Sequence, residues 1–230
     1  MKPQKIKYAP LFAAMLLCVA LAGCDGALHE SGEGRFSQSE TQDGTRAAPR
    51  ADAVRAAAGG DITLRNTEHR QLAAVTTALR QAGCRVDCGA DYIRLTRTEP
   101  LRAVPPVQTT PYPGFPTDCQ AIFMAALLQS RGTTVFVENI FQSRYRHVPE
   151  LIRMGADIRT EGRVAVVCGV ERLHGAEVVA TDLRGGAALV TAGLAAEGIT
   201  TVQGVGHIHR GYEELPAHLR ALGAHITEEN

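Results

Sequence analysis

The amino-acid sequence predicts an α/β fold built from repeated units, and two observations support this prediction. First, one pattern recurs in three stretches, 59–87, 131–159 and 197–227. It consists of a glycine, a β-branched strand, a helix that ends at a second glycine, and a further strand. Second, the runs between these stretches are apolar on every side of a helix, which is typical of helices buried on every side. Together they predict about three βαβαββ units in one domain.

The helix of each repeat is expected to be amphipathic, because its apolar residues lie one turn apart on one face. They are Leu72, Val75 and Leu79, then Val148, Leu151 and Ile152, then Leu215, Leu219 and Leu222. A glycine follows each helix, as expected for a C-cap in the left-handed conformation. These glycines are Gly83, Gly155 and Gly223.

The helices that are apolar all round lie in 117–134 and 181–201, and both stretches begin with Thr-Asp. The first follows PYPGFP, in which Pro113 and Pro116 fix the backbone while Gly114 permits a tight turn. This lead-in predicts a helix start, and Asp118, held at a set place. Asp is also a favoured N-cap residue, so capping is the alternative role for Asp118.

The first 56 residues differ from the rest of the chain. Residues 1–24 combine a basic start with a short apolar run, which is typical of an export signal. Leu21-Ala22-Gly23-Cys24 is similar to the lipobox of bacterial lipoproteins, which predicts lipidation of Cys24; a spurious start codon or a gene-fusion junction is the alternative. Residues 25–56 have few large apolar side chains, so we expect a disordered linker before a folded domain at 57–230.

Charge and cysteine content exclude several classes of function. Lys and Arg number 24, as do Asp and Glu, so the formal net charge is zero and no nucleic-acid partner is expected. Cys84, Cys88, Cys119 and Cys168 form no CxxC pair and have no histidine pair at zinc spacing. We therefore expect buried free thiols and no metal site.

Four stretches resemble the C-terminal half of the UDP-N-acetylglucosamine enolpyruvyl transferase (1-carboxyvinyltransferase) family. They are PYPGFPTDCQ, VENIFQSRYRHVPELIRMGADI, GVERLHGAEVVATDLRGGAALVTAGLAAEG and HIHRGYEELPAHLRALGA. The resemblance covers 59–229. The sister enzyme acting on 3-phosphoshikimate shares the fold, but IFQSRYRHVPEL and ATDLRGG are more similar to the amino-sugar enzyme.

The resemblance implies an inside-out α/β barrel domain, with helices inside and sheets outside. It also implies addition of the 3'-hydroxyl of UDP-N-acetylglucosamine to C2 of phosphoenolpyruvate, followed by loss of phosphate, without a cofactor. In the family this reaction is the first committed step of peptidoglycan synthesis. The resemblance therefore also implies a part in cell wall biogenesis, cell shape and the cell cycle. The family's location is the cytoplasm; a membrane-anchored lipoprotein, held through Cys24, is the alternative.

The family's site residues fall on matching positions of this sequence. Asp118 matches the sugar-contacting aspartate proposed to take the hydroxyl proton, and Ile140 matches a contact to the uridine-sugar substrate. The cations that line the phosphoenolpyruvate site match Arg144, Arg184 and Arg210. A doubly anionic substrate favours such planar guanidinium groups.

Asp182 matches an aspartate beside these arginines, although capping of its own helix explains it equally well. Ser143 and His209 depart from the family pattern, which has Asn and Asp there.

The family's other domain, with its proton-donating cysteine, has no counterpart in the matched stretches. The resemblance therefore implies an enzyme that is incomplete or inactive alone unless a separate chain supplies the missing domain. Two alternatives remain. One is a non-catalytic, lipid-anchored scaffold or sugar-nucleotide-binding domain, and the other is a truncated or chimeric reading frame.

Overall fold

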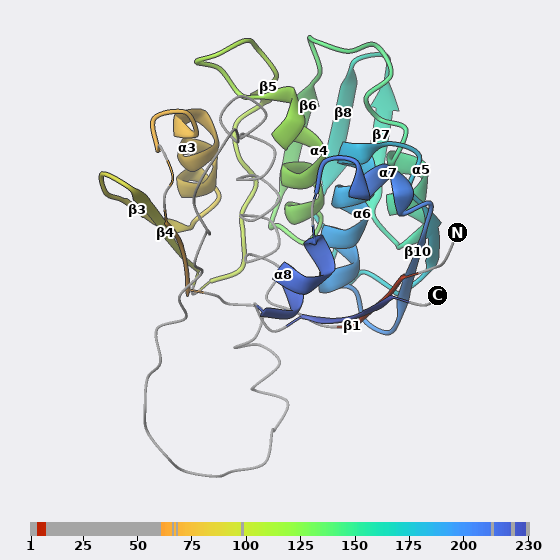
Figure 1. Ribbon diagram of the computed structural model, residues 1–230. Helices are drawn as coiled ribbons and strands as arrows, with labels where there is room; N and C mark the ends of the chain where they lie inside the picture. The colour runs from red at the N-terminus through yellow and green to blue at the C-terminus, as the bar shows by residue number, and fades with distance from the viewer. Residues whose placement is uncertain are drawn as a thin grey trace.

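The computed structural model describes residues 4–7 and 61–228, except for 66, 68, 98, 213, 222 and 223. Most of the predicted signal and linker, including Cys24, lies outside the described residues, as do Leu222 and Gly223 of the third repeat. The described strands form three separate sheets around buried helices (Figure 1). Among the described residues, no helix combines the length and apolar character needed to cross a bilayer.

The middle unit shows the predicted βαβαββ order in full. Its elements are β5 (Val107–Gln108), α4 (Thr117–Ala126), β6 (Thr133–Val137), α5 (Val148–Arg153), β7 (Asp157–Glu161) and β8 (Val164–Cys168). The strands are arranged as β5-β6-β8-β7, with the first pair parallel and the others antiparallel. Gly155 ends the helical stretch with a φ of +93°, as the C-cap prediction requires.

The first unit is shorter and contains, among the described residues, a βαββ order. Its elements are β2 (Asp61–Arg65), α3 (Ala73–Gln81), β3 (Arg85–Cys88) and β4 (Tyr92–Thr96). The antiparallel order β2-β4-β3 repeats that of β6, β8 and β7 in the middle unit. Gly83, with a φ of +102°, follows α3 at the place predicted for a C-cap.

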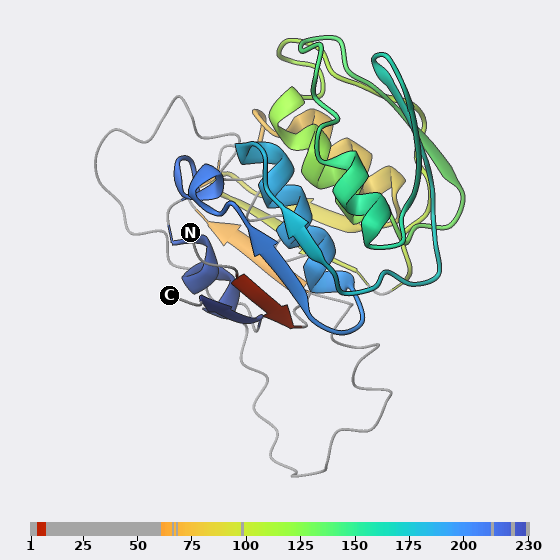
Figure 2. The same ribbon diagram turned by 90° about the vertical axis from the view of Figure 1, so that its right-hand side faces the viewer.

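The third unit obtains one strand from the far end of the chain. Its elements are β9 (Glu177–Val179), α6 (Leu183–Ala195), β10 (Thr200–Gln203), α7 (Gly206–His209), α8 (Leu215–Ala221) and β11 (His225–Glu228). Strand β1 (Gln4–Lys7) lies antiparallel between β10 and β11, where the middle unit has β8 (Figure 2). The second and third sheets therefore have the same arrangement.

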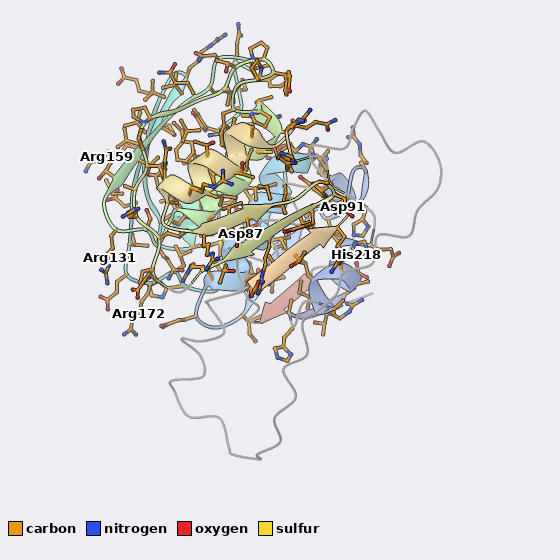
Figure 3. All side chains as sticks on the ribbon, turned by 90° about the vertical axis from the view of Figure 1, so that its left-hand side faces the viewer. Asp87, Asp91, Arg131, Arg159, Arg172 and His218 are labelled. Atoms are coloured by element: carbon orange, nitrogen blue, oxygen red, sulfur yellow. The ribbon has the colours of Figure 1, made fainter. Side chains whose placement is uncertain are left out.

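Helices α4 and α6 pack against each other inside the sheets. Every residue from Cys119 to Ala126 is buried, as is every residue from Arg184 to Leu194, which confirms the prediction of helices apolar and buried all round. Charged side chains such as Asp87 in β3 and Arg159 in β7 lie on the outside (Figure 3). The α/β class with helices inside is thus confirmed, but the described strands form open sheets and no closed barrel.

The predicted burial of the apolar helix faces is wrong at one position, Ile152. Val148 and Leu151 of α5 are buried, but Ile152 is 46% exposed. Helix α5 has only six residues, so the buried stripe it presents is narrow. Among the described residues, none of the four cysteines predicted to be buried free thiols forms a disulfide, but Cys88 and Cys168 are only partly buried.

Candidate functional site

Asp118 is the second residue of α4, not its N-cap. The helix begins at Thr117, and the extended Pro116 occupies the N-cap position without a side-chain bond. The alternative role of Asp118 as a cap is therefore wrong, because the helix begins two residues too early for it. The turn before it is tight: the Gly114 N–H donates to the Pro111 carbonyl at 2.9 Å, and the Tyr112–Pro113 peptide is cis.

The carboxylate of Asp118 is shared by two arginines. Nη2 of Arg144 donates to Oδ1 at 2.8 Å, and Nη2 of Arg184 donates to Oδ2 at 2.9 Å. The Asp118 side chain is 36% exposed, whereas those of Arg144 and Arg184 are 15% and 6% exposed. Two guanidinium charges against one carboxylate leave an excess positive charge, which suits an anionic ligand.

Aromatic rings support both guanidinium groups. The Arg144 guanidinium lies 5.0 Å from the Phe141 ring centroid, and that of Arg184 lies 5.5 Å from the Tyr212 ring centroid. Nη1 of Arg184 also donates to the Tyr212 hydroxyl at 3.1 Å. Burial alone lowers the pKa of Arg184, but Tyr212 and Asp118 outweigh it and the pKa is raised. Arg184 is therefore a fixed cation.

The loop that carries Ile140 and Arg144 is held by Glu138. Its Oε1 accepts hydrogen bonds from the N–H groups of Ile140 at 2.9 Å and Phe141 at 3.0 Å. Ile140 and Phe141 are 40% and 49% exposed, so both offer apolar surface near Arg144. The predicted substrate contact Ile140 is thus accessible on the loop that leads to the site.

Asp182 is the N-cap of α6, since its Oδ1 accepts from the Gly185 N–H at 2.8 Å. Close packing surrounds this cap: a Cβ on Gly185 would lie 2.9 Å from the Cβ of His147. Burial of His147 lowers its pKa to about 4, and neither ring nitrogen has a hydrogen-bond partner among the described residues. Asp182 therefore holds the first turn of the helix that carries Arg184.

Arg210 lies at the end of α7 and is exposed. The next residue, Gly211, packs against Leu183, since a Cβ there would lie 2.8 Å from Leu183 Cδ2. This places Arg210 beside the start of α6. No hydrogen bond or ion pair joins Arg210 to Asp118 within the described part of the chain, so only two of the three predicted arginines, Arg144 and Arg184, bind this carboxylate.

The sequence predictions did not include Glu138, Tyr212 or His147, although all three support the site. The sequence offers one indication of Glu138, which is an acidic residue directly after the strand 133–137. Acidic residues are rarely buried, and Glu138 is fully buried. Within the described residues no cluster of His, Cys, Asp or Glu could hold a metal ion. The arrangement places a carboxylate, which can accept a proton or a hydrogen bond, beside two guanidinium groups, which can bind an anion.

Comparison with known proteins identifies the same family. The family model of EPSP synthase (3-phosphoshikimate 1-carboxyvinyltransferase) matches residues 43–219, beginning inside the segment predicted to be a linker. The UDP-N-acetylglucosamine 1-carboxyvinyltransferase of Desulfofundulus thermocisternus is 52% identical over 171 residues, which are 74% of this chain and 70% of that protein. That of Zymomonas mobilis is 51% identical over 168 residues, or 73% of this chain and 39% of that protein.

Solved structures agree on the fold. The enolpyruvyl transferase NikO from Streptomyces tendae is 32% identical with a TM-score of 0.63, over 68% of this chain and 36% of that one. EPSP synthase from Acinetobacter baumannii is 19% identical with a TM-score of 0.57, over 75% of this chain and 43% of that one, and shares the fold alone.

A third relative, UDP-N-acetylglucosamine 1-carboxyvinyltransferase 3 of Symbiobacterium thermophilum, is 50% identical over 74% of this chain and 40% of its own length. The chain thus spans about two fifths of the length of this relative and of the one from Zymomonas mobilis. The resemblance seen in the motifs is confirmed, and the chain belongs to the EPSP synthase family of enolpyruvyl transferases.

Proposed function

We propose that this chain forms one wall of the active site of a UDP-N-acetylglucosamine 1-carboxyvinyltransferase. The observation that supports this most directly is the carboxylate of Asp118 between Arg144 and Arg184, in a chain about half identical to relatives of that name. The reaction transfers the enolpyruvyl group of phosphoenolpyruvate to the 3'-hydroxyl of the amino sugar, as a step in peptidoglycan synthesis.

The chemistry divides into an addition and an elimination. In the addition, the sugar hydroxyl oxygen bonds to C2 of phosphoenolpyruvate, C3 gains a proton, and Asp118 accepts the hydroxyl proton. In the elimination, the C2–O bond to phosphate breaks and C3 loses a proton, which restores the double bond. Arg144 and Arg184 hold the carboxylate and phosphate charges during both steps, because planar guanidinium groups bind such anions with paired hydrogen bonds.

Three further residues complete this wall. Arg210, exposed beside the start of α6, adds positive charge for the same anion. Ile140 supplies an accessible apolar contact to the sugar nucleotide. Asp182 keeps the first turn of α6, and with it Arg184, in place through its bond to the Gly185 N–H.

The reaction also requires an acid for C3, and we assign none of the described cysteines to that role. Cys84 and Cys119 are buried, and Cys88 and Cys168 lie outside the Asp118 cluster in β3 and β8. We propose that a separate chain carrying the rest of the family's length supplies this acid. Both substrates are cytoplasmic metabolites, so the cytoplasm is the expected location.

The test uses the full chain with both of the family's acceptors. In calorimetric titrations we expect UDP-N-acetylglucosamine to bind and 3-phosphoshikimate not to bind, with the Asp118→Ala variant as the control for the site. Phosphate release from phosphoenolpyruvate should stay at background with this chain alone and rise when the remaining part of a relative is added. Binding of 3-phosphoshikimate instead would overturn the proposal that UDP-N-acetylglucosamine is the acceptor. Rapid turnover by the chain alone would overturn the proposal that a second chain supplies part of the active site.

A further inference from the structure

Glu138 is a fully buried acid directly after strand β6, with 0% of its surface exposed. A buried carboxylate is costly unless hydrogen bonds compensate for its lost hydration. Three donors do so here: the Thr117 hydroxyl reaches Oε2 at 3.0 Å, and the N–H groups of Ile140 and Phe141 reach Oε1 at 2.9 and 3.0 Å. The charge is therefore fixed in one orientation.

These donors come from the two segments that carry the site. Thr117 is the first residue of α4 and directly precedes Asp118. Ile140 and Phe141 begin the loop that leads to Arg144, and the Phe141 ring lies under the Arg144 guanidinium. One carboxylate thus joins the helix start that carries Asp118 to the loop that carries Arg144.

Neighbouring bonds hold the base of the same loop to the sheet. The Asn139 N–H donates to the Thr109 hydroxyl at 2.8 Å, and Nη1 of Arg163 donates to the Asn139 carbonyl at 3.0 Å. Glu138 joins the loop start to α4 through the Thr117 hydroxyl. Further along the same loop, Arg144 donates to the Thr117 carbonyl and to Asp118. Glu138 is therefore placed to set the distance between these two site residues.

We propose that Glu138 is a positioning residue, which holds the Ile140 loop against α4 so that Arg144 and Asp118 meet in the geometry that binds substrate. It does not touch the substrate itself, because it is fully buried. This inference rests on the proposed function of the Asp118 site and adds a residue to its support.

The hydrogen-bond chemistry predicts an order among variants. In Glu138→Gln the amide oxygen still accepts from both N–H groups, and its NH₂ donates to the Thr117 hydroxyl, so the geometry survives without the charge. In Glu138→Leu all three donors lose their acceptor. Thr117→Val removes the hydrogen bond between α4 and Glu138, and it keeps the two bonds from the N–H groups of Ile140 and Phe141. Glu161, exposed at the end of β7, provides the matched control Glu161→Leu.

The experiment measures two quantities on the full chain: affinity for UDP-N-acetylglucosamine by calorimetry, and hydrogen-exchange protection of the Ile140 and Phe141 amides by NMR. We expect Glu138→Leu to weaken binding about tenfold or more, equivalent to about 1.4 kcal/mol, and to lose the protection of both amides. Glu138→Gln should stay within about threefold of wild type with the amides protected, since the shape of the network is kept. Thr117→Val should weaken binding while the amides stay protected.

Equal binding by Glu138→Leu and Glu161→Leu would overturn the proposal, and so would binding lost equally in the Gln and Leu variants. If Glu138→Leu does not fold, Thr117→Val decides, because wild-type affinity there contradicts a role for the tie to α4. If the wild-type chain binds no UDP-N-acetylglucosamine, the proposed function fails. The exchange of the Ile140 and Phe141 amides then tests the positioning role by itself. Protection lost only in Glu138→Leu supports the proposal that Glu138 holds the loop, and equal protection in all variants overturns that proposal.

Discussion

Arg184 donates to the Asp118 carboxylate at 2.9 Å, so the residue proposed to accept a proton is bound to a residue proposed to hold the anionic substrate. Arg144 occupies the other oxygen of the same carboxylate at 2.8 Å. Asp118 and an incoming phosphate or carboxylate group thus compete for the same guanidinium donors. Binding of the anion is expected to draw the arginines away and leave an Asp118 oxygen available to the sugar hydroxyl.

This competition predicts that Asp118→Asn binds phosphoenolpyruvate several-fold more tightly than wild type, although it removes the proton acceptor. The neutral amide no longer offers a charged partner to either arginine. Calorimetric titration with phosphoenolpyruvate measures the effect, and Asp157→Asn, at the exposed start of β7, is the control. Weaker binding by Asp118→Asn would show that the carboxylate helps to arrange the anion site and does not compete with the anion.

Replacement of Arg184 by lysine should not preserve its role. The arginine uses Nη1 for the Tyr212 hydroxyl and Nη2 for Asp118, and a lysine presents one compact charge without this fork. We expect Arg184→Lys to lower phosphoenolpyruvate affinity about tenfold or more and to destabilise the fold by about 1–3 kcal/mol, because a buried acceptor loses its donor. Arg159→Lys, on the exposed face of β7, should change neither quantity in the same titration and urea unfolding.

The start of α6 should not tolerate a methyl group. A Cβ on Gly185 would lie 2.8 Å from the Asp182 carboxylate and 2.9 Å from His147, so either the cap or the His147 packing must move. Gly185→Ala is expected to cost about 1–3 kcal/mol of unfolding free energy, as overpacking in a core does.

Gly193→Ala, in the same helix, is the control for this change. Its Cβ would lie 3.1 Å from the Thr200 side chain, a milder contact. Urea unfolding of both variants measures the difference, and a loss at Gly193 as large as that at Gly185 would contradict the argument.

Stability should decrease as the pH is lowered, because His147 is held neutral in the folded chain. Burial lowers its pKa from 6.5 to about 4, against the opposing attraction of Asp182, so the folded chain holds the ring neutral. The unfolded chain binds the proton first, and the stabilisation present above pH 6.5 is lost progressively as the pH falls toward 4. The full effect is about 3 kcal/mol.

His147→Gln should remove this part of the pH dependence between pH 7 and 4.5, as followed by urea unfolding at each pH. His225→Gln, on the exposed side of β11, should retain it. Identical pH dependence in wild type and His147→Gln would mean that the ring is not held neutral.

The sequence could predict the features that depend on local pattern. Apolar residues on every side predict the buried helices α4 and α6. The place of Gly83 and Gly155 after an amphipathic stripe predicts their left-handed conformation. The similar Thr-Asp starts are misleading, because Asp182 caps its helix whereas Pro116 occupies the N-cap position of α4 and leaves Asp118 inside the first turn. A cap depends on where the backbone enters the helix, which dipeptide similarity does not fix.

Other features depend on partners distant in sequence. Glu138 is explained only by donors on α4 and on its own loop, which come together in the folded chain. The bonds between Asp118 and the two arginines likewise join three separate segments. Strand β1 carries no pattern that could indicate its neighbours, because four residues contain too little alternation to specify a register.

The position of β1 has a consequence for the order of folding. Ile6 pairs with Thr200 and with Ile226, so the third sheet is completed only when β1 meets strands that lie about 200 residues later in the sequence. The middle sheet needs only neighbouring strands, and closing a long loop costs more chain entropy than closing a short one. We therefore expect amides of β6 and β8 to gain protection before those of β10 and β11 in pulse-labelled refolding, and simultaneous protection would contradict this order.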